Sequence, residues 1–265
     1  MIGRLKTRHS YKENGMEYKS AGDKTASVHV LTGGGRLRIL EADAPKGVIV
    51  ICTGGGFNIL AAREAEPVAN AFAAYGWGGA LLDYSLYTGE PLGELPVRQL
   101  GEAVAITKEE FPGKPVAVCG FSAGGVVACG LCVHYARLGL PRPDALILGY
   151  SVLTSGKYAH EGTISRLAGG GDRSPFCMEN HVKPDMPPAF IWHTVSDPVV
   201  PVQNSLLLAR AMADAGVPFE LHLFQDGPHS MSIATEEVAD AVHVASPHIA
   251  KWVGLCAEWL DALEC

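Results

Sequence analysis

One stretch of sequence decides the fold of this chain: Val116-Ala117-Val118-Cys119-Gly120-Phe121-Ser122-Ala123-Gly124-Gly125. Its apolar first half is typical of a strand covered on both faces, and the small apolar residues at 126–131 continue the chain as a helix. A strand that turns into a helix this abruptly leaves no space for side chains two positions before and after the serine. Gly120 and Gly124 satisfy that requirement, so the pattern predicts a strained turn with Ser122 at its tip.

Short apolar segments alternate with segments of helical length on both sides of this turn. Strands are predicted at residues 47–52, 78–84, 115–119, 145–150, 189–193 and 219–224, with an antiparallel hairpin at residues 27–31 and 36–40. Helices are predicted at residues 67–75, 206–215 and 248–263. This alternation predicts a mostly parallel sheet of about eight strands with helices on both faces, and together with the serine turn it indicates the α/β-hydrolase fold.

The chain length of 265 residues suits one domain, residues 1–265. One connection, at residues 151–187, is unusually long and contains three consecutive glycines. Long connections in compact domains are often lids or binding loops. We therefore expect this segment to form a small cap over the functional site.

A serine hydroxyl becomes a nucleophile only when a neighbouring base takes its proton. In this fold an acid and then a histidine follow the serine along the chain. Asp197 stands in the loop after the predicted strand at 189–193, and His229 directly follows the last predicted strand. Asp226 is the alternative acid, but it lies in the same loop as His229. The sequence therefore predicts Ser122 as nucleophile, His229 as base and Asp197 as the group that orients the base.

The chemistry of acyl transfer also needs backbone N–H groups that stabilise an oxyanion. The residue after the nucleophile, Ala123, supplies one such donor in this fold. The loop Thr53-Gly54-Gly55-Gly56-Phe57 follows an early strand and predicts Gly55 and Gly56 as further donors. A phosphate-binding loop is disfavoured, because the G-x-G-x-x-G spacing is lacking and no G-K-[ST] follows.

Composition narrows the class of protein further. The net charge is −7 and Lys and Arg form no dense cluster, so neither nucleic acid nor a membrane surface is an expected partner. No apolar run follows Met1 to Lys6, so no signal peptide is predicted. No stretch of the sequence approaches the length of apolar residues that a membrane span needs, and the cytoplasm is the expected location. The seven cysteines are expected to be buried reduced thiols, and the histidines lack the spacing of metal ligands. We expect no metal and no cofactor.

The chain resembles the α/β-hydrolase acetylesterases, a family that includes acetylxylan esterases and bifunctional acetylxylan/feruloyl esterases. The resemblance begins near residue 47 and rests on three segments: Cys52-Thr53-Gly54-Gly55-Gly56-Phe57 with Glu66-Pro67-Val68-Ala69, then Gly120-Phe121-Ser122-Ala123-Gly124-Gly125, then Trp192-His193-Thr194-Val195-Ser196-Asp197-Pro198-Val199-Val200-Pro201 with Gly227-Pro228-His229. Thr53 departs from the Pro or His that often precedes the glycines. The resemblance implies a small-molecule ester substrate with a short acyl group, acetyl first, on a xylo-oligosaccharide or another oligosaccharide.

The predicted function is therefore hydrolysis of short-chain esters through an acyl-enzyme. Phe57, Tyr158, His160 and His193 are candidates for contacts with the substrate. Two alternatives stay open: a serine peptidase of the prolyl-oligopeptidase type, which shares the order of the triad, and a catalytically silent hydrolase-fold protein that binds a ligand. A homo-oligomer is compatible with the sequence.

Overall fold

The computed structural model of this chain describes residues 12–13, 16–17 and 25–263, so the predictions for Met1 to Lys6 and for Cys265 lie outside the described residues. The strands of the main sheet are β3 (Thr25–Val30), β4 (Arg36–Leu40), β5 (Val48–Cys52), β6 (Gly78–Asp83), β7 (Val116–Phe121), β8 (Ala145–Gly149), β9 (Ala189–Thr194) and β10 (Phe219–Phe224). Two short strands, β1 (Lys12–Glu13) and β2 (Met16–Glu17), pair separately.

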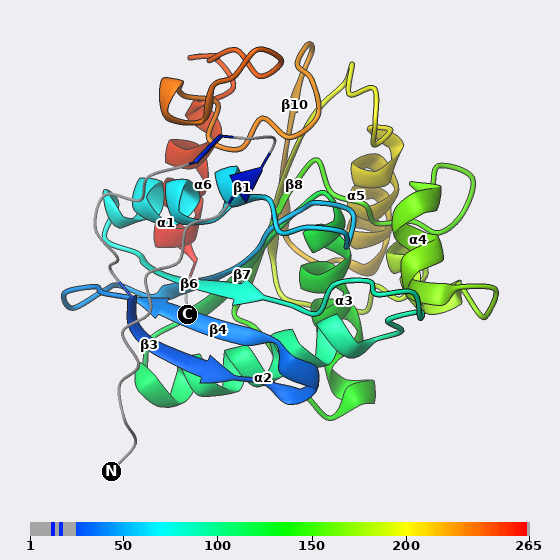
Figure 1. The fold of residues 1–265 in the computed structure, drawn as a ribbon, viewed down its shortest axis with the longest axis horizontal. Coiled ribbons are helices and arrows are strands. Elements are labelled where there is room, and N and C mark those ends of the chain that lie inside the picture. The colour runs from blue at the N-terminus through cyan, green and yellow to red at the C-terminus, as the bar shows by residue number, and fades with distance from the viewer. Residues whose placement is uncertain (1–11, 14–15, 18–24, 264–265) are drawn as a thin grey trace.

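The main sheet has eight strands in the order β10-β9-β8-β7-β5-β6-β4-β3 (Figure 1). Neighbours from β10 to β6 are parallel, whereas β4 is antiparallel to both β6 and β3. The predicted α/β-hydrolase fold is thus confirmed. Every predicted strand is present with ends that differ by at most two residues. β7 runs further than expected because Gly120 and Phe121 still pair with Leu148 and Gly149 of β8.

Helices cover both faces of the sheet (Figure 1). The apolar cluster on one face includes side chains of α2 (Leu95–Glu110), α3 (Ala123–Leu138) and α5 (Gln203–Ala215). The cluster on the other face includes side chains of α1 (Glu66–Ala73) and α6 (Lys251–Ala262). Because β5, β7, β8 and β9 lie between these clusters, they are buried along their whole length. This explains their continuous apolar sequences.

The long connection at residues 151–187 contains α4 (Glu161–Ala168) and the short 3-10 helices η3 (Ser174–Phe176) and η4 (Met178–Asn180). The backbone carbonyls of Arg166 and Leu167 accept hydrogen bonds from the amides of Leu92 and Gly93. These bonds fasten α4 to the loop before α2. The function of this segment as a cap stays a prediction. Three further 3-10 helices are η1 (Thr32–Gly34), η2 (Ala62–Glu64) and η5 (Glu236–Val238).

Parallel strands end at a common edge of the sheet. The loops after β5, β7, β9 and β10 therefore emerge side by side, and ligands of open α/β sheets bind at this edge. These four loops carry the glycine run, Ser122, Asp197 and His229.

Candidate active site

The turn between β7 and α3 has the strained geometry that the sequence predicts. Ser122 adopts φ 48° and ψ −120°, a conformation that side-chain-bearing residues rarely adopt. A Cβ on Gly120 would lie 2.5 Å from the Gly124 carbonyl oxygen, and a Cβ on Gly124 would lie 2.1 Å from the Cys52 carbonyl oxygen. Both glycines are therefore required by close backbone contacts, and they let Ser122 sit at the first turn of α3.

Three predicted residues from separate loops meet at this turn. His229 Nε2 lies 2.8 Å from Ser122 Oγ, and His229 Nδ1 lies 2.7 Å from Asp197 Oδ2. An ionised carboxylate only accepts hydrogen bonds, so Nδ1 carries the proton and Nε2 is free to accept from the serine hydroxyl. The arrangement is one in which the imidazole can take a proton from Ser122.

The Asp197 carboxylate is fixed from several sides. Its Oδ1 accepts hydrogen bonds from the backbone amides of Val199 at 2.8 Å and Val200 at 2.9 Å. Burial acts to raise the pKa of Asp197, but hydrogen bonds from His193 and His229 and the charge of His229 outweigh it and hold the pKa well below its usual range. Asp197 is therefore charged at neutral pH and points its second oxygen at the imidazole.

His193 lies behind Asp197, and its prediction as a substrate contact is corrected by the structure. Its side chain is fully buried, with Nε2 3.0 Å from the Val200 carbonyl oxygen and Nδ1 2.8 Å from Ser205 Oγ. Because a carbonyl only accepts, Nε2 carries the proton; this nitrogen is also 3.4 Å from Asp197 Oδ2. His193 therefore supports the acid and cannot reach a substrate.

The glycine loop lies directly beside the nucleophile. A Cβ on Gly54 would lie 2.8 Å from Ser122 Cβ, so this residue must be glycine. Gly55 and Gly56 follow with φ values of 111° and 62°, and both are partly exposed. Within the described chain, their backbone amides donate to no protein acceptor. These amides are suited to an oxyanion, and their role as donors together with that of Ala123 stays a prediction.

Phe57 does not line the site, and this prediction is also corrected. Its side chain is fully buried and packs edge-on against Tyr84, with ring centroids 5.4 Å apart. Phe57 therefore anchors the end of the glycine loop in the apolar core. Sequence reasoning could not distinguish an aromatic side chain that anchors this loop from one that faces a ligand.

Tyr158 and His160 lie at the start of α4, where they were predicted to contact substrate. His160 caps the helix, because its Nδ1 accepts from the Thr163 amide at 3.3 Å. Burial lowers the pKa of His160, and the nearby charge of His229 lowers it further. This coupling puts His160 within electrostatic range of His229. The Tyr158 carbonyl accepts from Asn204 at 3.0 Å, and both predicted contacts remain predictions.

Sequence reasoning missed a buried carboxylate beneath the glycine loop, that of Glu64. Glu64 is fully buried, and its carboxylate accepts hydrogen bonds from the Gly54 amide and the Tyr150 hydroxyl. The only signal in the sequence is an acidic residue just after the glycine loop, which a surface helix start would also show. Arg166 of α4 was also missed; its guanidinium donates to the Gly56 carbonyl at 3.1 Å and links the long connection to the glycine loop.

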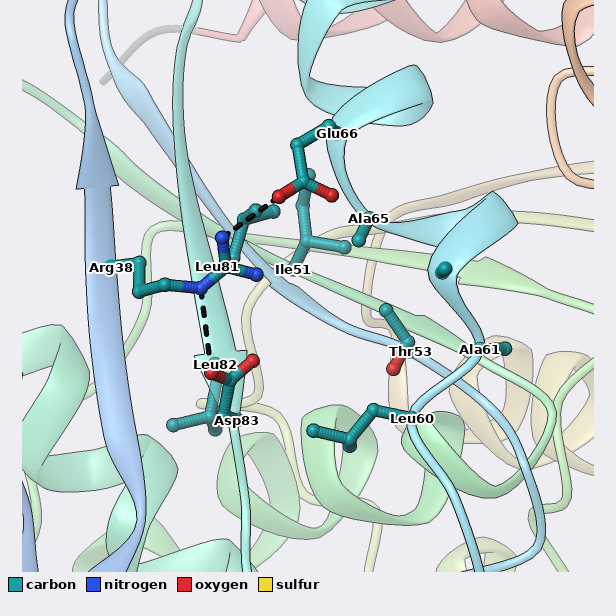
Figure 2. Close-up of a pocket in the computed structure, with 11 residues that line it drawn as sticks. Arg38, Ile51, Thr53, Leu60, Ala61, Ala65, Glu66, Leu81, Leu82 and Asp83 are labelled. Atoms are coloured by element: carbon teal, nitrogen blue, oxygen red, sulfur yellow. Dashed lines mark hydrogen bonds and ion pairs between the residues drawn. The ribbon is translucent and has the colours of Figure 1, made fainter. Parts of the chain in front are cut away.

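A separate cavity lies between β4, β6 and the start of α1 and contains none of Ser122, Asp197 and His229 (Figure 2). Arg38 pairs there with both Glu66 at 2.8 Å and Asp83 at 3.4 Å. In the described part of the chain, no group of three or more His, Cys, Asp or Glu side chains could hold a metal ion. None of the described helices is long and apolar enough to cross a membrane.

The fold and the site together define an α/β-hydrolase in which a histidine is hydrogen-bonded to a serine on one side and to an aspartate on the other. Comparison with known proteins agrees with this class. Residues 144–254 match the prolyl oligopeptidase family, a region that includes Asp197 and His229 but not Ser122.

Several proteins similar to this chain carry the names of esterases or of xylan-degrading enzymes. The chain is 32% identical over 216 residues to endo-1,4-beta-xylanase B of Butyrivibrio fibrisolvens; the match covers 74% of this chain but only 34% of that relative's length. The acetyl ester-xyloside bifunctional hydrolase from Caldicellulosiruptor lactoaceticus superposes with a TM-score of 0.78 at 26% identity, covering 92% of this chain and 98% of the other. A carboxylesterase from Lactobacillus plantarum has the same fold, with a TM-score of 0.79, 24% identity and coverage of 89% and 95%. The resemblance to acetylesterases is thus confirmed.

Proposed function

We propose that this chain is a serine carboxylic ester hydrolase that cleaves short-chain esters, acetyl esters of xylo-oligosaccharides or other oligosaccharides first. One observation carries the proposal: the unbroken line of contacts from Ser122 Oγ through His229 to Asp197, beside free backbone amides. A serine activated in this way, next to donors for an oxyanion, is suited to acyl transfer.

The proposed reaction has two steps. Ser122 Oγ attacks the ester carbonyl while His229 Nε2 takes the hydroxyl proton, and the amides of Gly55, Gly56 and Ala123 stabilise the oxyanion. His229 then gives the proton to the leaving alcohol, which departs and leaves an acyl-enzyme. Water, activated by the same imidazole, hydrolyses this acyl-enzyme. Asp197 stays ionised throughout and stabilises the cationic imidazole.

The substrate class is supported by the relatives. One is named as an acetyl ester-xyloside hydrolase and another as a xylanase. We do not propose xylanase activity, because glycoside hydrolysis needs two carboxyl groups that flank the sugar. The carboxylates beside the serine, Glu64 and Asp197, are both buried and already bonded to neighbouring groups of the protein.

The experiment is hydrolysis of 4-nitrophenyl acetate, butyrate and octanoate by wild type, Ser122→Ala and the matched control Ser165→Ala on an exposed part of α4. We expect acetate to be fastest, the control to equal wild type, and Ser122→Ala to lose a factor on the order of 10⁶ in turnover. Equal, feeble rates for wild type and Ser122→Ala would refute the proposal. Release of acetate from acetylated xylo-oligosaccharides then tests the alcohol.

The match to the prolyl oligopeptidase family makes a serine peptidase the second candidate. It predicts cleavage of aminoacyl anilides at rates comparable with the esters, and that result would displace the esterase proposal. A silent binding protein predicts instead that a fluorophosphonate fails to label Ser122 in the folded protein.

A further inference from the structure

Only Gly54 separates the buried carboxylate of Glu64 from the predicted nucleophile, Ser122. A Cβ on Gly54 would sit 2.8 Å from Ser122 Cβ on one side and 2.9 Å from Glu64 Oε2 on the other. The Gly54 amide donates to Glu64 Oε2 at 2.5 Å. Glu64 thus fixes the backbone of the glycine loop at the residue that immediately precedes Gly55 and Gly56.

The other oxygen of the Glu64 carboxylate is connected through Tyr150 to the loop that follows β10 and carries His229, the histidine loop. Glu64 Oε1 accepts from the Tyr150 hydroxyl at 2.8 Å, and that hydroxyl accepts from the Ser232 amide at 3.0 Å. The Tyr150 ring packs edge-on against the His229 imidazole, with centroids 5.1 Å apart. A second bond ties the same segments, because Ser232 Oγ donates to the Arg63 carbonyl at 2.5 Å.

The hydrogen-bond pattern around Glu64 suits an ionised carboxylate. Both groups that contact its oxygens, the Gly54 N–H and the Tyr150 O–H, are donors. A carboxylate accepts both bonds as they stand, whereas a protonated acid would have to donate its proton to the Tyr150 hydroxyl oxygen and reverse that bond. Burial raises the pKa of Glu64, while the two hydrogen bonds and the nearby His229 and Arg63 act to lower it.

A buried charge is costly, and a structural bridge could be made from neutral groups. The position of this charge, next to an imidazole that becomes positive during acyl transfer, suggests why a carboxylate stands here. We propose that Glu64 is a positioning residue that couples the glycine loop to the histidine loop and whose negative charge favours the protonated form of His229. This inference rests on the proposed esterase function.

Three variants distinguish the effect of the hydrogen bonds that join the glycine loop to the histidine loop from the effect of the negative charge of Glu64. Glu64→Gln removes the charge and replaces one acceptor oxygen with a donor. Glu64→Asp keeps the charge on a shorter side chain. Tyr150→Phe keeps Glu64 but removes the hydroxyl that links it to Ser232. Each is assayed for kcat, KM and the pH profile of kcat/KM on 4-nitrophenyl acetate, with the active fraction counted by fluorophosphonate labelling.

We expect Glu64→Gln to lose roughly 10²-fold in kcat per labelled site with KM little changed, as for a small misplacement of reacting groups. The acid limb of its kcat/KM pH profile should move to lower pH, because the variant lacks the negative charge of Glu64 that favours the protonated imidazole of His229. Tyr150→Phe keeps the charge of Glu64, so it should lower kcat without moving the acid limb to lower pH, and Glu64→Asp should keep that limb near its wild-type position. The other charged or titratable groups facing this pair are common to all four proteins: Arg63, Tyr84, Cys119, His160 and Asp197.

Wild-type kcat in Glu64→Gln, or a loss of kcat with an unmoved acid limb, would overturn the assignment. If Glu64→Gln does not fold, Tyr150→Phe decides the coupling, and normal kcat in that variant refutes it. Failure of the proposed function looks different: wild type itself would then cleave aminoacyl anilides as fast as esters, as a peptidase does, or be inactive on esters and unlabelled at Ser122, as a silent binding protein is.

Discussion

Replacing Asp197 with Asn tests the proposal that Asp197 orients His229, because neighbouring backbone amides determine which way the new side-chain amide must face. The amides of Val199 and Val200 both donate to Oδ1, so the Asn oxygen must occupy that position. The Asn NH2 group then faces His229 Nδ1 and forces this nitrogen to accept. The proton moves to Nε2, which points at Ser122 Oγ and can no longer take the serine proton.

This change in tautomer should lower kcat by about 10⁴-fold, or about 5 kcal/mol of transition-state stabilisation. The assay is 4-nitrophenyl acetate hydrolysis, with folding checked by circular dichroism. The matched control is Asp226→Asn, the same chemical change at the exposed acid of the histidine loop, which should leave kcat unchanged. If Asp197→Asn retained more than about a tenth of wild-type kcat, or Asp226→Asn lost as much, the assignment of the acid would be wrong.

Three further predictions concern packing and charge. Gly124→Ala places a Cβ 2.1 Å from the Cys52 carbonyl oxygen and should cost about 1–3 kcal/mol or more in urea unfolding, whereas Gly170→Ala meets nothing within 4 Å and should change stability by less than about 0.5 kcal/mol. Burial raises the pKa of Glu64 above its ordinary 4.5, so its ionisation opposes folding increasingly as pH rises above that value. The Tm of Glu64→Gln relative to wild type should therefore increase from acid to neutral pH, and a flat difference would contradict this sign. Burial also raises the pKa of five thiols, so iodoacetamide should modify them only after unfolding, and labelling located by peptide mapping at any of these five in the native protein would contradict their burial. They are Cys52, Cys119, Cys129, Cys132 and Cys256.

The strands and the three triad candidates were accessible to sequence reasoning for a physical reason. Strands buried on both faces must be apolar throughout, and the loops that follow them must emerge at one edge of the sheet. Asp197 was therefore preferable to Asp226, because Asp226 lies in the same loop as His229 whereas Asp197 follows a strand of its own. The structure adds the contacts, which put Asp197 against His229 and leave Asp226 exposed.

Residues whose environment depends on distant segments could not be assigned in this way. Glu64 and Glu66 look alike in the sequence, yet one is fully buried beneath Gly54 and the other pairs with Arg38 on β4. His193 misled for a related reason. It ends a strand that is covered on both faces, so neither face of that strand was open to a substrate.

The two carboxylates beside the imidazole are opposed in their acidity. For Asp197, hydrogen bonds from two histidines and two amides outweigh burial and lower the pKa. For Glu64, burial outweighs its two hydrogen bonds and raises the pKa. As pH falls from neutral, Glu64 must take up a proton before Asp197 does. Asp197 therefore still orients His229 at a pH at which the Glu64 carboxylate, which joins the glycine loop to the histidine loop, has lost its charge.

This order has a consequence for the shape of the pH profile. If Glu64 and His229 both lose their active forms on the acid side, their protonations are coupled and the acid limb of wild type falls more steeply than one proton allows. In Glu64→Gln only the base remains to titrate on that side, so the limb should fall with the slope of a single proton. Asp197 stays ionised in both proteins and His160 is common to both, so the change in slope isolates Glu64. Equal slopes would mean that Glu64 does not titrate in the working enzyme, and its charge would then be a fixed part of the site.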